Sequence, residues 1–255
     1  MPLRETEAIV LRTYRLGEAD KIVSFFTRQF GRLRAAATGA QRPKSRYGGS
    51  LEPLSYVRLW LFERENRDLL RLNSAELVES FYDMQKDYRV QVAVQYLVEV
   101  SERILPEREV NERAFRLLLA VGRALKRSGE VDRPLVYFNY WLLRLAGFLP
   151  DLEHCAACGK ALGDRPGYYG RGSEGLCCAD CRISPTGRTG LARQTASPAA
   201  LGLAAAMRRL PLDQWLAGET PSAGVRELRL FLEEVLEAHA ERKFVTRELL
   251  NEEEL

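Results

Sequence analysis

Two pairs of cysteines, each pair with two intervening residues, constrain the fold of this 255-residue chain more than any other feature. Cys155 and Cys158 form the first pair, and Cys178 and Cys181 form the second, with nineteen residues between Cys158 and Cys178. Two residues between cysteines let both sulfurs of one turn face the same ion, and two such turns complete a tetrahedron. The spacing therefore predicts one Zn²⁺ per chain. Because four thiolates leave no position for water or substrate, the predicted site is structural.

Other interpretations of the cysteines stay open. Free thiols or disulfides are the alternative to a metal site. Cys177 lies beside Cys178 and offers a pair with three intervening residues to Cys181, although the shorter spacing favours Cys178. His154 is a further candidate ligand. The sequence lacks H-E-x-x-H and the H-x-E plus P-C-x-x-C signature, so zinc hydrolysis and zinc deamination have no support.

Residues 1–80 have the hydrophobic pattern of short strands. The expected strands are Glu7–Arg12, Lys21–Phe26, Tyr56–Phe62 and Leu69–Leu72. Glycines and a proline separate them, as turns require. Several short strands in so few residues predict a small barrel, and the arginine-rich connection favours an OB-fold.

From about residue 81 the apolar residues follow a helical period. The expected helical segments lie around residues 90–104, 115–125, 134–146 and 228–239. Gly147 should end the third of them. His239 lies on the apolar stripe of the last one, which predicts a core histidine.

Two further helix starts are expected at Ser197-Pro198 and Thr220-Pro221, where an N-cap residue precedes proline.

The predicted fold class is multi-domain α+β. It combines an N-terminal OB-fold barrel (residues 1–80), an all-helical domain (residues 81–150 plus 194–255) and an inserted four-cysteine zinc module (residues 151–193). The insert is rich in glycine, arginine and turn residues, so its own core would be small. A metal would replace that missing core.

Positive charge is concentrated in one part of the strand-rich region. Residues 21–51 hold seven basic residues and no acid, although the net charge of the chain is only +3. The seven are Lys21, Arg28, Arg32, Arg34, Arg42, Lys44 and Arg46. Such a stretch attracts a polyanion, and Tyr47 could stack a base. The stretch predicts a nucleic-acid-binding surface, for which a solvated polar loop is the alternative.

The same loop comes close to a phosphate-binding motif but lacks a required residue. The motif G-x-x-x-x-G-K-[ST] needs glycine directly before the lysine, where Pro43 stands. Proline removes a backbone N–H that a phosphate cradle needs. Nucleotide hydrolysis has no support, and no nucleophile–base pair or carboxylate dyad is evident. The chain is therefore expected not to be an enzyme.

Three groups of residues carry a resemblance to a known family. They are Ala8–Arg12 with Leu16–Val23, then Phe26–Arg28 through Gly31–Leu33 and Gly39–Tyr47, and finally Leu143–Pro150 running into Cys155–Gly159. With these motifs the chain resembles the RecO family of bacterial DNA repair proteins. The resemblance covers residues 1–80 and 135–181, whereas the other helical segments match only in helical character.

The resemblance implies a non-enzymatic recombination mediator of the RecF pathway. Such a protein binds single- and double-stranded DNA, anneals complementary strands and helps to load recombinase onto DNA coated with the single-stranded DNA-binding protein SSB. The implied partners are DNA, RecR and SSB, whose acidic C-terminal tail docks on the helical domain. Zinc knuckles are not universal in the family, which implies a stabilising role for the metal.

A basic helix end is the predicted site for that tail. An acidic, aromatic tail needs an apolar slot flanked by cations. The expected helix Phe115–Arg127 ends in Arg123, Lys126 and Arg127, beside a leucine-rich face. A core helix with a solvated basic end is the alternative for these residues.

The chain is expected in the cytoplasm, in association with the nucleoid. Its start, Met1–Glu5, lacks the apolar segment of a secretory signal, and no run of eighteen apolar residues predicts a membrane span. Cysteines clustered as a metal site fit a reducing compartment. Two other functions remain open: a zinc-ribbon RNA-binding accessory protein of transcription or translation, and a metal-dependent nuclease.

Overall fold

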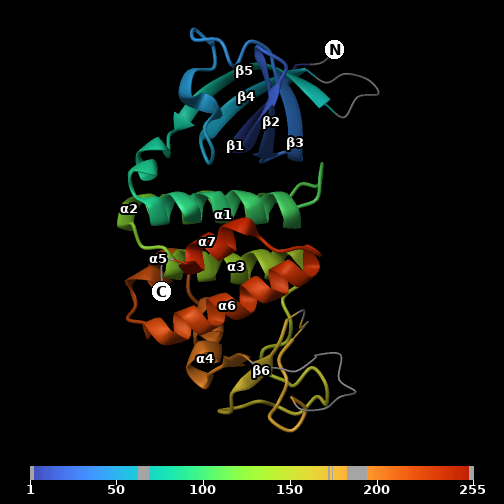
Figure 1. The fold of residues 1–255 in the computed structure, drawn as a ribbon, viewed down its shortest axis with the longest axis vertical. Helices are drawn as coiled ribbons and strands as arrows, with labels where there is room; N and C mark the ends of the chain where they lie inside the picture. The colour runs from blue at the N-terminus through green and yellow to red at the C-terminus, as the bar shows by residue number, and fades with distance from the viewer. Residues whose placement is uncertain (1–2, 63–68, 172, 174, 183–193, 253–255) are drawn as a thin grey trace. The chain divides into compact units, whose positions relative to one another are not determined.

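The computed structural model describes residues 3–62, 69–171, 173, 175–182 and 194–252 (Figure 1). The chain forms two compact units. The first consists of residues 1–129 with 248–255, and the second consists of residues 130–247. The three-domain division expected from the sequence remains a proposal.

A closed five-stranded barrel of OB-like form makes up the first part of the chain (Figure 1). Its strands are β1 (Leu3–Leu16), β2 (Asp20–Thr27), β3 (Gly31–Ala37), β4 (Tyr56–Phe62) and β5 (Leu69–Glu79). Around the barrel they follow the order β1-β2-β3-β5-β4, and β4 pairs with β1 to close it. All pairs are antiparallel except β3 with β5. Closure removes the exposed sheet edges that an open sheet of this size would have.

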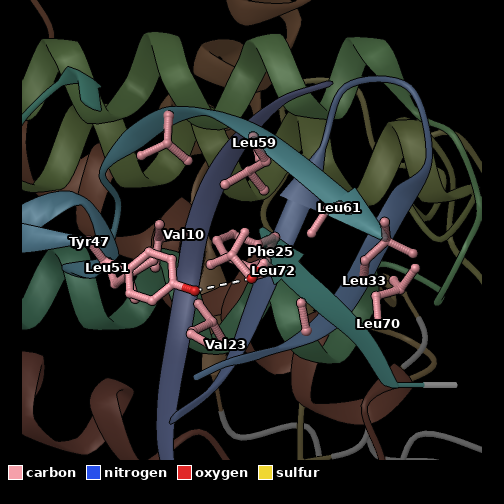
Figure 2. Packing of buried hydrophobic residues seen from close by; sticks show 14 residues of the cluster. Val10, Val23, Phe25, Leu33, Tyr47, Leu51, Leu59, Leu61, Leu70 and Leu72 are labelled. Atoms are coloured by element: carbon pink, nitrogen blue, oxygen red, sulfur yellow. Dashed lines mark hydrogen bonds between the residues drawn. The ribbon is translucent and has the colours of Figure 1, made fainter. Parts of the chain in front are cut away.

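The barrel is held together by alternate side chains that point inward from every strand. Figure 2 shows Val10, Val23, Phe25, Leu59 and Leu72 meeting in this core. A shift of register between Val10 and Arg12 marks a bulge in β1, which lets one long strand pair with both β2 and β4. The alternating apolar residues of the predicted strands therefore form the core of the predicted barrel.

Two long helices belong to the same unit as the barrel, α1 (Tyr88–Ile104) and α2 (Glu112–Ser128). Asp87 and Asn111 cap them by accepting hydrogen bonds from the N–H groups of Val90 and Ala114. The connection between the helices passes so close to Gly31 that a Cβ there would lie 2.2 Å from the Glu109 carbonyl oxygen. Only glycine fits this contact, which brings the helices against the barrel.

The second unit is mainly helical and carries the cysteines. Its elements are α3 (Asp132–Ala146), β6 (Gly167–Tyr169), β7 (Gln194–Ala196), α4 (Pro198–Met207), α5 (Leu212–Ala217) and α6 (Ser222–His239). Helix α6 packs against α3 and α4, and β6 pairs with β7. The last helix, α7 (Val245–Glu252), ends the described chain. Among the described residues, no helix has the length and apolar character needed to cross a bilayer.

The structure corrects three local predictions. The sequence pattern does not predict strand β3, because Arg-Leu-Arg-Ala-Ala-Ala has little strand propensity; its pairing with β2 and β5 decides its conformation. Thr220 does not cap α6, which begins at Ser222 after Pro221. His239 is exposed at the end of α6 and stacks on Phe148 at 4.3 Å between ring centroids, so it is not a core residue.

Two other local predictions are confirmed. Gly147 adopts the left-handed conformation directly after α3, with φ of 78°. Ser197 caps α4 by accepting the N–H of Ala200, and Pro198 occupies the first helical position.

Candidate nucleic-acid interface and metal centre

The four cysteines of the two pairs come together in the second unit. Their sulfur atoms all lie within 4.8 Å of one another, and Cys158 Sγ is 3.8 Å from Cys178 Sγ. A tetrahedral zinc ion with Zn–S bonds of about 2.3 Å separates its sulfurs by about 3.8 Å. Cys155 is buried, whereas the other three sulfurs lie on residues that are partly or fully exposed. The cluster therefore has the donor set and the spacing of a structural metal site.

Backbone N–H groups prepare Cys155 to act as a thiolate. The N–H of Cys178 donates to Cys155 Sγ at 3.2 Å, so the second turn already contacts the first. Burial by itself raises the pKa of Cys155, but N–H donors from Cys178, Cys158 and Ala157 outweigh it and lower the pKa to about 6. Hydrogen bonds to the sulfurs of Cys158 and Cys178 raise the pKa of Cys181 to about 12. Four sulfurs this close cannot all be thiolates unless a cation joins them.

The structure separates the cluster from the two other candidate ligands. Cys177 is fully buried, and its backbone exchanges two hydrogen bonds of 2.8 Å with Tyr168, so its neighbour Cys178 reaches the cluster instead. His154 lies outside the cluster, and its Nδ1 atom is 2.8 Å from Asp151 Oδ2.

An ion pair connects the two cysteine turns. Lys160, after the first turn, lies 3.4 Å from Asp180 in the second. The hydrogen bond from Lys160 to Asp180 and the nearby sulfurs of Cys158 and Cys178 raise the pKa of Lys160. A cation beside the sulfurs suits a metal centre with four thiolates, because that centre has a net negative charge.

On the barrel, the basic loop between β3 and β4 is fixed to the turn between β1 and β2. Gln41 donates through Nε2 to the carbonyl oxygens of Gly17, at 3.3 Å, and Asp20, at 2.6 Å. The N–H of Gln41 donates to Ala19, and Asp20 Oδ1 accepts the N–H of Gly39. The start of the loop, from which Arg42, Lys44 and Arg46 follow, is therefore held in place.

Tyr47 does not fit the expected role of stacking a base. Only 3% of the residue is exposed, and its hydroxyl donates to the Leu72 carbonyl oxygen at 3.1 Å, as Figure 2 shows. The ring lies in the barrel core, where a nucleic-acid base has no access. Its local sequence suggested a surface residue, whereas its contact with a strand 25 residues away decides its burial.

Three of the predicted basic residues are paired with acids. Arg28 contacts Glu7 at 2.9 Å and Glu112 at 2.6 Å. Arg32 and Arg34 both lie near Glu107, at 3.2 Å and 3.5 Å. These pairs join the barrel to α2 and to the connection between α1 and α2. The paired arginines therefore present less free positive charge than their sequence suggests.

The other predicted cations lie closer to open surface. Lys21 lines a cavity beside the β1–β2 turn, and Arg42 and Lys44 are exposed. Arg46 donates to the Tyr47 hydroxyl at 2.9 Å and covers that ring. Sequence reasoning missed Arg15, which lines the same cavity as Lys21 but precedes the acid-free stretch. The alternation of β1, read together with the turn at Gly17, could have indicated it.

Comparison with known proteins matches nearly all of the described chain to one family. The model of the N-terminal region of recombination protein O matches residues 1–81, and the model of its C-terminal region matches residues 85–248. The chain belongs to the RecO family. Its barrel, helices and cysteine cluster are thus found in a member of a DNA repair family.

Curated RecO relatives span nearly the whole chain. A DNA repair protein RecO of Koribacter versatilis is 41% identical over 98% of this chain and 98% of its own length. One from an Anaeromyxobacter species is 33% identical over 96% of this chain and 94% of its own. A third, from a Nocardioides species, is 39% identical over 71% and 75%.

The predicted tail-binding residues at the end of α2 are already engaged. Arg123 contacts Glu79 at 2.8 Å and lies over the Tyr56 ring, while Lys126 donates to the Ser80 carbonyl oxygen at 2.6 Å. The leucine-rich face of α2 is buried. The apolar slot expected beside these cations is therefore filled by the protein itself, and the exposed part of the helix end is cationic.

Proposed function

We propose that the protein is a non-enzymatic recombination mediator of the RecF pathway. In this role it binds single- and double-stranded DNA, anneals complementary strands and helps to load recombinase onto SSB-coated DNA. Membership of the RecO family is the observation that carries the proposal. The basic loop on the barrel supports it, since two strands repel through their phosphates and a cationic surface that binds both lowers this repulsion. The proposed site of action is the cytoplasm, at the nucleoid.

The proposed DNA surface consists of the cations of the barrel that reach its surface. It combines Lys21, Arg42, Lys44 and Arg46, with smaller contributions from the paired Arg28, Arg32 and Arg34. Phosphate contacts of this kind are independent of sequence and sensitive to salt.

A strand assay separates the proposed function from its alternatives. Purified protein is incubated with two labelled complementary DNA strands, with matched RNA strands, and with divalent metal. We expect faster formation of the DNA duplex and intact strands. Preference for RNA would favour an RNA-binding accessory protein, and metal-dependent cleavage would favour a nuclease.

The proposed cofactor is one structural Zn²⁺ per chain, held by the cluster Cys155, Cys158, Cys178 and Cys181. The fit of the sulfur spacing to a tetrahedron supports this choice. When bound, the ion supplies cross-linking and no chemistry. Metal analysis after reconstitution should give one equivalent, and less than half an equivalent would contradict the proposal. Cys178→Ser should remove the ion and Cys177→Ser should retain it.

The proposed protein partners are RecR and the C-terminal tail of SSB. The tail is assigned to the helical part of the chain, with Arg123, Lys126 and Arg127 as candidate contacts for its acidic residues. Isothermal titration of a tail peptide into the full chain tests this assignment. Reversing these three residues to glutamate should abolish binding, whereas unchanged affinity would remove the end of α2 from the site.

A further inference from the structure

A cavity of about 410 Å³ lies beside the β1–β2 turn of the barrel. It is lined by Thr13, Tyr14, Arg15, Lys21, Ala40 and Gln41. The two strands of the hairpin provide one wall, and the start of the basic loop provides the other. The hydrogen bonds of Gln41 to Gly17 and Asp20 hold these two walls together.

Two cations face each other across this hairpin. Arg15 and Lys21 are directly opposite in the register of β1 and β2, so their side chains lie on the same face of the sheet. Like charges in that position destabilise a pair of strands. Among the residues that the structure describes, neither side chain makes an ion pair with a carboxylate. The fold thus keeps a repulsive pair at the wall of an open cavity.

Within the described residues, the acids of the same turn form no ion pair with either cation. Asp20 directs its Oδ1 atom to the N–H of Gly39, at 2.8 Å, and Glu18 is exposed and does not line the cavity. An anion that enters between Arg15 and Lys21 would convert the repulsion into two favourable contacts.

We infer that this cavity is the binding site for a backbone phosphate of single-stranded DNA, with Arg15 and Lys21 as its cationic ligands. The inference deepens the proposed function and rests on it. Tyr14, which is 44% exposed, precedes Arg15 in β1 and pairs with Ile22, so its ring lies on the opposite face of the hairpin from the two cations. The volume of the cavity exceeds what a single phosphate needs, which suits a nucleotide.

The test measures how affinity for fluorescent oligo-dT depends on salt, with the full chain. The double variant Arg15→Gln/Lys21→Gln should reduce the slope of log K against log salt by about 0.7, because it loses the one phosphate contact that both cations make to a single strand. The matched control is Arg58→Gln/Lys86→Gln, which removes one arginine and one lysine that contact acids at 3.5 Å and 3.7 Å. The control should keep the wild-type slope.

A charge-reversal variant distinguishes a loss of DNA binding from a loss of folding. Lys21→Glu places an acid opposite Arg15, so it should raise the midpoint of thermal unfolding while it weakens oligo-dT binding at least tenfold. Lys21→Arg should restore binding. Tyr14→Leu, on the opposite face of the hairpin, should leave oligo-dT binding unchanged.

The outcomes distinguish the inference from the function on which it rests. If the wild-type chain does not bind oligo-dT, the proposed function is overturned. If it binds and the Arg15→Gln/Lys21→Gln variant keeps the wild-type slope, the phosphate site is overturned and DNA binding elsewhere stands. Binding of inorganic phosphate that depends on Arg15 and Lys21 but is not displaced by oligo-dT would also overturn the assignment to nucleic acid.

Discussion

The barrel and the cysteine-containing segment obtain their stability by different means. The barrel buries fourteen residues in one cluster, supplied by every strand and by the loop that carries Tyr47 (Figure 2). Residues 151–182 bury few large side chains, mainly Leu162, Tyr169 and Leu176, and instead gather four sulfurs. A short segment with so small a core needs a cross-link. A metal should therefore decide the structure of one region and leave the other unaffected.

The largest expected effect is the loss of the metal. Loss of a residue that only hydrogen-bonds to a metal ligand weakens metal binding by about 10- to 100-fold. Cys155→Ser removes a ligand itself, so it should weaken zinc binding by more than this. Limited proteolysis should then cut within residues 151–182, while the barrel stays resistant. Cys177→Ala is the control, because this buried cysteine lies outside the cluster. Early cleavage in the barrel would show that the folding of the barrel also depends on the metal.

The second effect comes from the opposite region. Phe25 is fully buried at the centre of the barrel, and Phe25→Ala should lower the free energy of unfolding by about 3–5 kcal/mol. Denaturant titration measures this loss, and zinc content should stay at the wild-type value. The control is Leu77→Ala on β5, where the side chain is 43% exposed and its loss should matter little. A zinc content that falls with Phe25→Ala would contradict the comparison.

The cysteine cluster and most strands could be predicted because their signals are local. Paired cysteines and apolar alternation act over a few residues, and each appears where the sequence placed it. Strand β3 and the burial of Tyr47 depend on partners far along the chain. The facing pair Arg15 and Lys21 depends on the register of a hairpin, which becomes visible only when both strands are in place.

A smaller effect tests the burial of Tyr47. Tyr47→Phe keeps the ring but removes the donor to the Leu72 carbonyl oxygen, so it should cost about 1 kcal/mol of unfolding free energy. Affinity for oligo-dT should not change. If Tyr47→Phe leaves stability intact and Tyr47→Leu weakens DNA binding, the ring is outside the core and acts as a stacking residue after all.

The smallest effect concerns how acid acts on the Glu7–Arg28 ion pair within the barrel. The hydrogen bond from Arg28 is the largest influence on Glu7 and, against a smaller opposing effect of burial, lowers the pKa of its carboxyl from the usual 4.5. A carboxyl whose pKa is lower in the folded state stabilises the fold above the unfolded pKa. This contribution disappears as the pH falls below about 4.5 and through the lower folded value. Since Arg28 is 45% exposed, the effect should stay below about 1 kcal/mol.

Urea unfolding at pH 6 and pH 3.5 measures this contribution in the wild-type chain and in Arg28→Gln. The variant should lose less stability between the two pH values, because its Glu7 titrates close to the usual pKa. Arg58→Gln serves as the control, since Arg58 lies 3.5 Å from Glu5 and influences Glu7 only weakly. Equal losses in the wild type and Arg28→Gln would mean that the Glu7–Arg28 pair adds nothing to the barrel. The barrel would then depend on its apolar core and not on this ion pair, whereas the cysteine-containing segment depends on a metal.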